Sequence, residues 1–170
     1  NDTLWSAKAL LECPDLVRKV HYDYYAAGAN AVEACSYQAT EAAFARKGIE
    51  KAEASRLIRL SGELVREAKN DALLEHPEWD PADLLTAGSI GPYGAYLADG
   101  SEYTGAYNLT REEYYAFHQL RLDELLNSGM DILAIETQPR FDEIEALLAM
   151  IADRDITCWV TVTLKDGDMP

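Results

Sequence analysis

The chain has 170 residues, with 30 acidic and 15 basic side chains, which gives a formal net charge of −15. This length favours a single domain over residues 1–170. An acidic surface repels phosphate backbones, so we expect no nucleic-acid partner. No run approaches the roughly 18 consecutive apolar residues of a membrane span. The start, Asn1 to Trp5, has no basic segment followed by an apolar one, so we expect no signal peptide and no membrane partner.

Three cysteines, Cys13, Cys35 and Cys158, are widely separated and form no Cys-x-x-Cys pair. This odd number without close spacing does not indicate a disulfide framework, and the histidines lack the His-Glu-x-x-His spacing of a zinc site. We therefore expect each cysteine to be a small buried apolar group. The compartment that fits free thiols is reducing, and we take it to be the cytoplasm.

Helical periodicity and helix-breaking residues define the first half of the chain. Pro14 at a first helical position and Gly28 as a stop predict a helix over 15–27. A strand over 30–36 and a loop over 37–40 follow. The next helix, over 51–75, has apolar residues on one face and charges on the other. It leads to a second strand over 84–89.

The second half repeats the alternation of strand and helix. A loop rich in glycine and tyrosine spans 90–109, and Thr110 with Glu113 forms a capping box for a helix that runs to about residue 128. A third strand over 131–135 ends at Glu136. A helix over 140–152 and a fourth strand over 156–164 complete the pattern. Short strands that are apolar on both faces predict parallel strands covered by helices.

Two α/β architectures fit this order: an open doubly wound sheet, or part of a (β/α)₈ barrel. Four strands are too few to close a barrel, which takes about 250 residues. Because the chain begins with a helix and ends just after a strand, we predict a segment of a longer protein.

Polar and aromatic residues cluster where the predicted strands end, which in parallel α/β folds is the edge that carries reactive groups. Glu136 is the sharpest of them, because a carboxylate directly after four apolar residues needs a cation or hydrogen-bond donors. A substrate ammonium would serve, and a capping or salt-bridged glutamate is the alternative. The other candidates at these strand ends are Ser36, Tyr37, Gln38, Gly88, Ser89, Pro92, Tyr93, Thr137, Thr161 and Thr163.

The segment Gly88 to Gly94 matches neither a dinucleotide-binding G-x-G-x-x-G nor a nucleophile elbow, and we do not expect Pro92-Tyr93 to open a helix. A tight turn that brings backbone close to a ligand is one interpretation, and a structural turn is the other. Four tyrosines in the following loop lie near Asp99 and Glu102. They either attract a cation such as a sulfonium or pack the loop. These tyrosines are Tyr93, Tyr96, Tyr103 and Tyr107.

Several stretches resemble the homocysteine S-methyltransferases that use S-methylmethionine or S-adenosylmethionine as methyl donor. They are Leu4–Lys8, Val20–Ala29, Ser36–Thr40, Ala87–Tyr103, Glu136–Pro139 and Glu143–Leu147. The resemblance implies a (β/α)₈ (TIM) barrel, of which this chain would hold about strands two to five, with outer helices. It also implies methyl transfer to the homocysteine thiolate in methionine biosynthesis, with zinc activating the thiolate. Homocysteine and a sulfonium donor would then be the small-molecule partners.

The resemblance also assigns candidate site residues. Glu136 stands where the family's glutamate holds the homocysteine amine, and the residues implied to line the pocket with it are Thr137, Tyr37, Gln38, Ser89 and Tyr93. By resemblance, the stretch Gly91–Tyr96 favours the sulfonium-donor branch over the betaine- or folate-dependent relatives.

The chain departs from the family in two respects. The zinc cysteines of relatives have no counterpart here, so none of the three cysteines is assigned to the metal and the segment alone is expected to be inactive. Glu33 and Ala34 stand where relatives carry an apolar residue and a threonine, and Glu33 inside a buried strand would need a partner. The alternative function is a non-catalytic half-barrel that self-associates or binds a partner through open strand edges.

Overall fold

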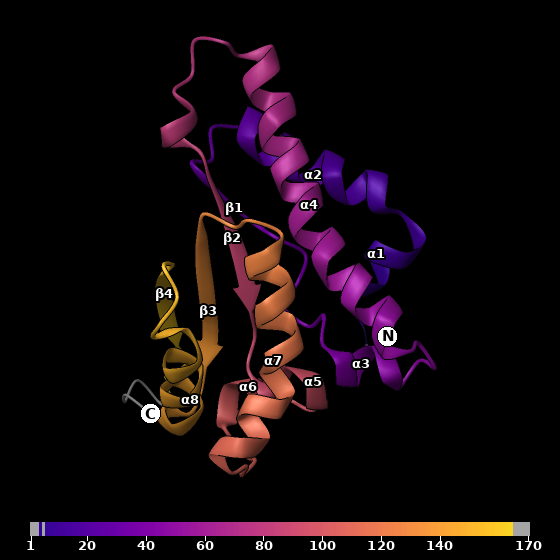
Figure 1. The fold of residues 1–170 in the computed structure, drawn as a ribbon, viewed down its shortest axis with the longest axis vertical. Helices are drawn as coiled ribbons and strands as arrows, with labels where there is room; N and C mark the ends of the chain where they lie inside the picture. The colour runs from indigo at the N-terminus through magenta and orange to yellow at the C-terminus, as the bar shows by residue number, and fades with distance from the viewer. Residues whose placement is uncertain (1–3, 5, 165–170) are drawn as a thin grey trace.

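The computed structural model describes Leu4 and residues 6–164. Its sheet has four parallel strands that pair in chain order (Figure 1). The strands are β1 (Ala31–Glu33), β2 (Leu85–Ile90), β3 (Ile132–Gln138) and β4 (Thr157–Val162). Each strand reaches its neighbour through at least one helix, which is the connection that parallel pairing requires. The predicted α/β segment with parallel strands is therefore confirmed.

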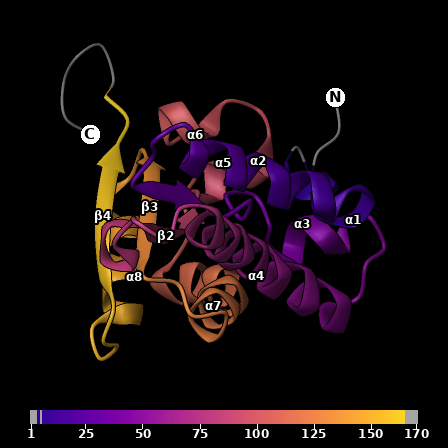
Figure 2. The ribbon, with the colours of Figure 1, turned by 90° about the horizontal axis from the view of Figure 1, so that it is seen from above.

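Most of the helices gather on one side of the sheet (Figure 2), and the helix after β3 packs Leu147 and Ile151 into the same hydrophobic core. The longer helices are α1 (Ala7–Glu12), α2 (Pro14–Ala26), α4 (Lys51–Glu75), α7 (Arg111–Asn127) and α8 (Phe141–Ile151). In α7 the predicted capping box is present: the Thr110 hydroxyl accepts from the Glu113 amide, and the Glu113 carboxylate accepts from the Thr110 amide. No helix in the part of the chain that the structure describes has the length and apolar character needed to cross a membrane.

The two faces of the sheet differ. Val32, Ile90, Leu133 and Ile135 pack into the main hydrophobic core under the helices. The opposite face, here called the inner face, carries a small cluster made of Leu85, Ala87, Ile132, Ala134 and Trp159. Side chains alternate along a strand, and Glu33 pairs in register with Ala87, so Glu33 belongs to the inner face. The edge strands β1 and β4 are the most exposed.

The boundaries of the strands differ from the predicted ones. β1 is shorter, because the amide of Ser36 turns back to the carbonyl of Ala34. β3 is longer and passes through Glu136 to end at Gln138, with a register shift between Ile135 and Gln138. This irregularity explains the early predicted end, since the apolar alternation stops where the register shifts.

The prediction that Pro92-Tyr93 would not open a helix is wrong. Pro92 is the residue before α5 (Tyr93–Leu97), and a second short helix, α6 (Ser101–Thr104), follows in the same loop. The amide of Tyr93 at the start of α5 has no acceptor within the helix, and it donates to the carboxylate of Glu143, 2.6 Å away. A distant carboxylate therefore replaces the local cap that the sequence lacks.

Other short elements lie outside the predicted pattern. α3 (Glu41–Ala45) begins after Thr40, whose hydroxyl accepts from the amide of Ala43. A 3₁₀ turn, η1 (Pro81–Asp83), precedes β2. The three cysteines, expected to be buried apolar groups, are only half-buried, although Cys35 and Cys158 pack against the hydrophobic core. All three are free, as their spacing predicts.

Candidate functional site

The carboxyl end of β3 carries a bulge with a strained residue. The ladder partners step from Ile135 with Val160 to Gln138 with Val162. Between them Thr137 has a φ of 56°, in the left-handed region that residues other than glycine rarely adopt. Its amide donates to the hydroxyl of Thr161 at 2.9 Å. Bulges re-aim side chains beside active sites, and here the bulge sets the direction of Glu136 and Thr137.

Glu136 lies half-buried at this bulge. Its carboxylate accepts a hydrogen bond from the hydroxyl of Ser89, a residue of β2 that is only 2 % exposed. The donor fixes one carboxylate oxygen from the neighbouring strand. The candidate residues of β2 and β3 therefore meet at the carboxyl end of the sheet, where Figure 1 shows the arrowheads of both strands.

A second carboxyl group joins Glu136. The side chain of Glu33 in β1 is hydrogen-bonded to that of Glu136. Glu33 was expected to lie in a buried strand, but the residue is exposed, and its partner is another acid. Partial burial of its carboxyl group, together with the negative charge of Glu136, raises the pKa of Glu33 to about 7. Glu33 is therefore protonated over a wider pH range than an ordinary glutamate, and the two neighbouring acids form a site that favours cations.

Tyr37 connects the loop after β1 to the bulge. Its hydroxyl is hydrogen-bonded to Thr137, and burial raises its pKa. The ring packs so closely on Gly91 that an added Cβ there would lie 2.7–2.8 Å from three ring carbons. Only a glycine leaves room for this ring.

Gln38 and Tyr93 support the loops around this group. The Gln38 amide nitrogen donates to the carbonyl of Ala95 at 2.9 Å, and the residue is 8 % exposed. The Tyr93 ring packs against Tyr96, Tyr107 and Phe117, with ring centroids 4.9–5.5 Å apart. Of the six predicted residues, Glu136, Thr137, Ser89 and Tyr37 come together directly. The part of each residue in substrate binding stays a prediction.

The tyrosine loop fits the packing interpretation better than a cation cage. The guanidinium of Arg46 lies 3.7 Å from the centroid of the Tyr96 ring, and that of Arg140 lies 5.7 Å from the Tyr107 ring. Cations of the chain itself therefore face two of these rings. Tyr103 points largely into solvent, at 62 % exposed.

Sequence reasoning missed a buried polar group behind this site. His118 and Glu143 are both 0 % exposed, and Arg121 is 1 % exposed. His118 and Arg121 lie one turn apart on α7, while Glu143 lies in the first turn of α8. The three-residue spacing was visible in the sequence, but such a pair on a helix is usually a solvated face.

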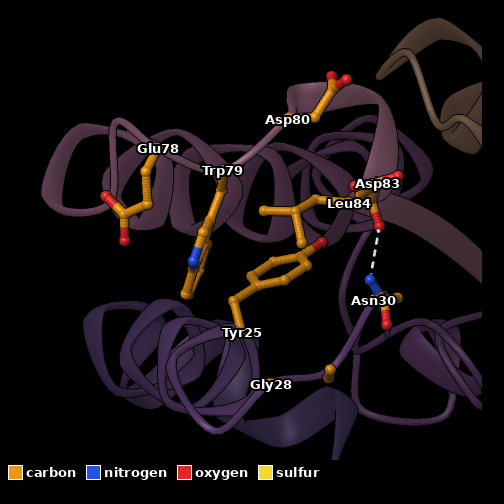
Figure 3. A pocket seen from close by; sticks show the side chains of 9 residues that line it. Tyr25, Gly28, Asn30, Glu78, Trp79, Asp80, Asp83 and Leu84 are labelled. Carbon is orange, nitrogen blue, oxygen red and sulfur yellow. Dashed lines mark hydrogen bonds between the residues drawn. The ribbon is translucent and has the colours of Figure 1, made fainter.

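A separate cavity of about 420 Å³ lies at the other end of the strands (Figure 3). Tyr25 and Trp79 point into it, and Asn30 donates from its side chain to the carbonyl of Asp83 at 3.0 Å. Asn30 and Leu84 directly precede β1 and β2, so this cavity borders the amino ends of the strands. It is distinct from the group around Glu136.

The described residues do not fit a zinc site. Within Leu4 and 6–164, no three histidine, cysteine or acidic side chains lie close enough together to hold a metal ion. Cys158 pairs in register with Leu133, whose side chain packs in the core, so it faces away from the inner face.

Parallel strands covered by helices define an α/β protein, a class in which ligand sites usually lie at the carboxyl ends of the strands, where this donor-held carboxylate is found. A family model described as homocysteine S-methyltransferase matches residues 1–170. The homocysteine S-methyltransferase of Escherichia coli K12 is 50 % identical over 168 residues, which are 98 % of this chain and 54 % of that protein. The chain belongs to the homocysteine S-methyltransferase family.

Solved structures show the same likeness. The homocysteine methyltransferase MmuM from Escherichia coli matches with TM-scores of 0.93 in its oxidized form and 0.92 in its metallated form, at 48 % sequence identity. The match covers 100 % of this chain and 59 % and 60 % of the two solved chains. This chain therefore spans little more than half the length of its relatives.

Proposed function

We propose that the protein containing this chain transfers a methyl group from S-methylmethionine or S-adenosylmethionine to homocysteine, giving methionine. The methyl carbon forms a bond to the homocysteine sulfur as its bond to the donor sulfonium breaks. The thiol proton goes to solvent, and the donor leaves as a neutral thioether. Family membership supports the reaction class. The carboxyl group of Glu136 on the inner face is the observation that supports an amino acid such as homocysteine as the substrate.

Glu136 is proposed to hold the ammonium group of homocysteine. Its carboxylate already has one oxygen fixed by Ser89, which leaves the remaining acceptor positions for an ammonium ion. The carboxyl group of Glu33 lies beside it, and a bound cation would favour loss of the Glu33 proton and so add negative charge to the site. Thr137 and Tyr37, which contact each other, would border the substrate on the side of the bulge. Gln38 and Tyr93 would keep the surrounding loops in place through their hydrogen bonds to Ala95 and Glu143.

Zinc is proposed as the cofactor of the complete protein, with all of its ligands outside the described residues. The metallated form of the Escherichia coli relative supports a metal in the family. We also propose that the complete protein closes a (β/α)₈ barrel around the inner face and works in the cytoplasm in methionine biosynthesis. The exposed edges of β1 and β4 are where further strands would pair.

The second candidate, a non-catalytic half-barrel that associates through its strand edges, is less favoured. It rests on the same exposed edges of β1 and β4. It gives no role to the strained Thr137 or to the two carboxyl groups on the inner face, whereas substrate binding uses both.

The test replaces Glu136 by glutamine in the longest form of the protein that its gene encodes. Glutamine can still accept from Ser89 but carries no charge, so the KM for homocysteine is expected to rise about 10- to 100-fold, the worth of a charge-assisted hydrogen bond. E145Q, an exposed change on α8, is the matched control and should leave KM unchanged. Full methyl transfer by E136Q at the wild-type KM would refute the assignment.

A further inference from the structure

Behind the proposed site, three buried side chains form a continuous polar chain. An Nη2 of Arg121 lies 2.7 Å from Nδ1 of His118, and Nε2 of His118 lies 2.8 Å from a carboxylate oxygen of Glu143. All three are almost fully buried, although two carry formal charges. Burying such a chain is costly unless its members satisfy one another, so the arrangement needs a reason beyond packing.

The hydrogen bonds fix the protonation of His118. Arginine only donates, so Nδ1 must accept, and Nε2 carries the proton and donates to Glu143. Burial, aided by the charge of Arg121, lowers the pKa of His118 to about 4, so the imidazole is neutral. Burial also lowers the pKa of Arg121, to about 10, which leaves the guanidinium charged at neutral pH. His118 is therefore neutral and is hydrogen-bonded to the buried guanidinium on one side and to the buried carboxylate on the other. This arrangement is here called the neutral relay.

The two ends of this row of polar side chains hold the loops that carry the site, and the hydrogen bonds that do so are here called the grip. Arg121 donates to the carbonyl of Tyr37 at 2.6 Å and to that of Gly91 at 2.7 Å. Glu143 accepts from the amide of Tyr93 at 2.6 Å. The gripped atoms follow β1 and β2, whereas the gripping side chains come from α7 and α8.

Tyr37 connects the grip to the bulge at the end of β3. The carbonyl of Tyr37 is held by Arg121, its ring rests on Gly91, and its hydroxyl is hydrogen-bonded to Thr137. Thr137 is the strained neighbour of Glu136. A shift of the Tyr37 backbone therefore moves a side chain that touches the bulge, although Arg121 itself lies too deep to reach a substrate.

We propose that Arg121, His118 and Glu143 are positioning residues that hold Tyr37 and Tyr93 in place for substrate binding at Glu136. The inference rests on the proposed function, because it assigns the gripped loops to the homocysteine site. It predicts that weakening the grip impairs ground-state binding more than turnover.

The experiment compares R121K, H118L and H118Q in the longest form of the protein that its gene encodes. Lysine keeps the charge but cannot serve two carbonyls and the imidazole in the same geometry, and leucine breaks the relay. Glutamine offers an oxygen to Arg121 and an N–H to Glu143, so it should rescue. We expect R121K and H118L to raise the KM for homocysteine about tenfold with kcat changed much less, and H118Q to stay near wild type. R111K, an exposed change on the same helix, is the matched control.

A merely structural role gives a different result, since partial unfolding lowers the active fraction and hence kcat while KM stays constant. That result, or failure of H118Q to rescue, would overturn the proposal. If the wild-type protein transfers no methyl group, the proposed function fails separately. Amide hydrogen exchange then tests the grip without any activity. Exchange that is faster in R121K than in wild type at residues 37–41 and 91–97, with α4 unchanged, supports the proposal, and unchanged exchange at these residues overturns it.

Discussion

Replacing Gly91 by alanine should push the Tyr37 ring away from its seat. The added methyl carbon would lie 2.7 Å from Cε2 and 2.8 Å from both Cδ2 and Cζ of that ring. Carbon atoms prefer about 3.5–4.0 Å, so the ring must retreat by about 1 Å. It cannot do so freely, because its carbonyl is held by Arg121 and its hydroxyl by Thr137. Gly91 does not have the left-handed backbone that would penalise alanine by itself, so the effect is steric.

Overpacking of this kind costs about 1–3 kcal/mol in the free energy of unfolding. Urea denaturation of wild type, G91A, Y37A and the double variant forms a thermodynamic cycle that isolates the clash. In the Y37A background, G91A should cost less than about 0.5 kcal/mol, because the ring it strikes is gone. G28A is the matched control: its Cβ meets nothing within 4 Å but its φ of 98° is unfavourable, so its cost should be the same in both backgrounds. Equal costs of G91A with and without the Tyr37 ring would refute the reasoning.

Two further predictions concern pH. The pKa of Glu33 is about 7 in the folded protein and about 4.5 without its surroundings, so the folded state binds more protons between these values and loses stability as pH rises through them. The gain in Tm of E33Q over wild type should therefore grow from about pH 5 to about pH 8, and a constant gain would contradict the pairing with Glu136. The pKa of His118 is lowered from 6.5 to about 4, so stability is present above about pH 6.5 and is lost as pH falls towards 4, by about 3 kcal/mol. H118Q should remove this loss but not the parallel one from buried His21, and an imidazolium signal of His118 in nitrogen NMR at about pH 6 would disprove the neutral relay.

The sequence allowed the sheet to be predicted because its signals are local. The helix over 51–75 follows from apolar spacing, and the start of α7 follows from Thr110 and Glu113. Glu136 was found because one carboxylate after an apolar strand breaks a simple pattern. These features depend on neighbours within a few residues, which a sequence displays directly.

The remaining features depend on partners far away in the chain. α5 begins at Tyr93 because Glu143, 50 residues later, accepts its amide hydrogen. The strained Thr137 lies at the register shift between β3 and β4, and a threonine in the sequence does not indicate a positive φ. Glu33 was recognised as unusual, but its carboxylic partner depends on the register of three strands. Tertiary contacts of this kind override local preference and are invisible to pattern analysis.

Pairing of the strands in chain order has a consequence for synthesis on the ribosome. Each new strand of the sheet docks on the strand made just before it, so no strand has to wait for a partner that is still to be translated. The loops to be closed are those of single βα units, which keeps the entropic barrier of each step small. The sheet can thus grow by successive addition as the polypeptide emerges, because each new edge strand is covered by the strand translated next.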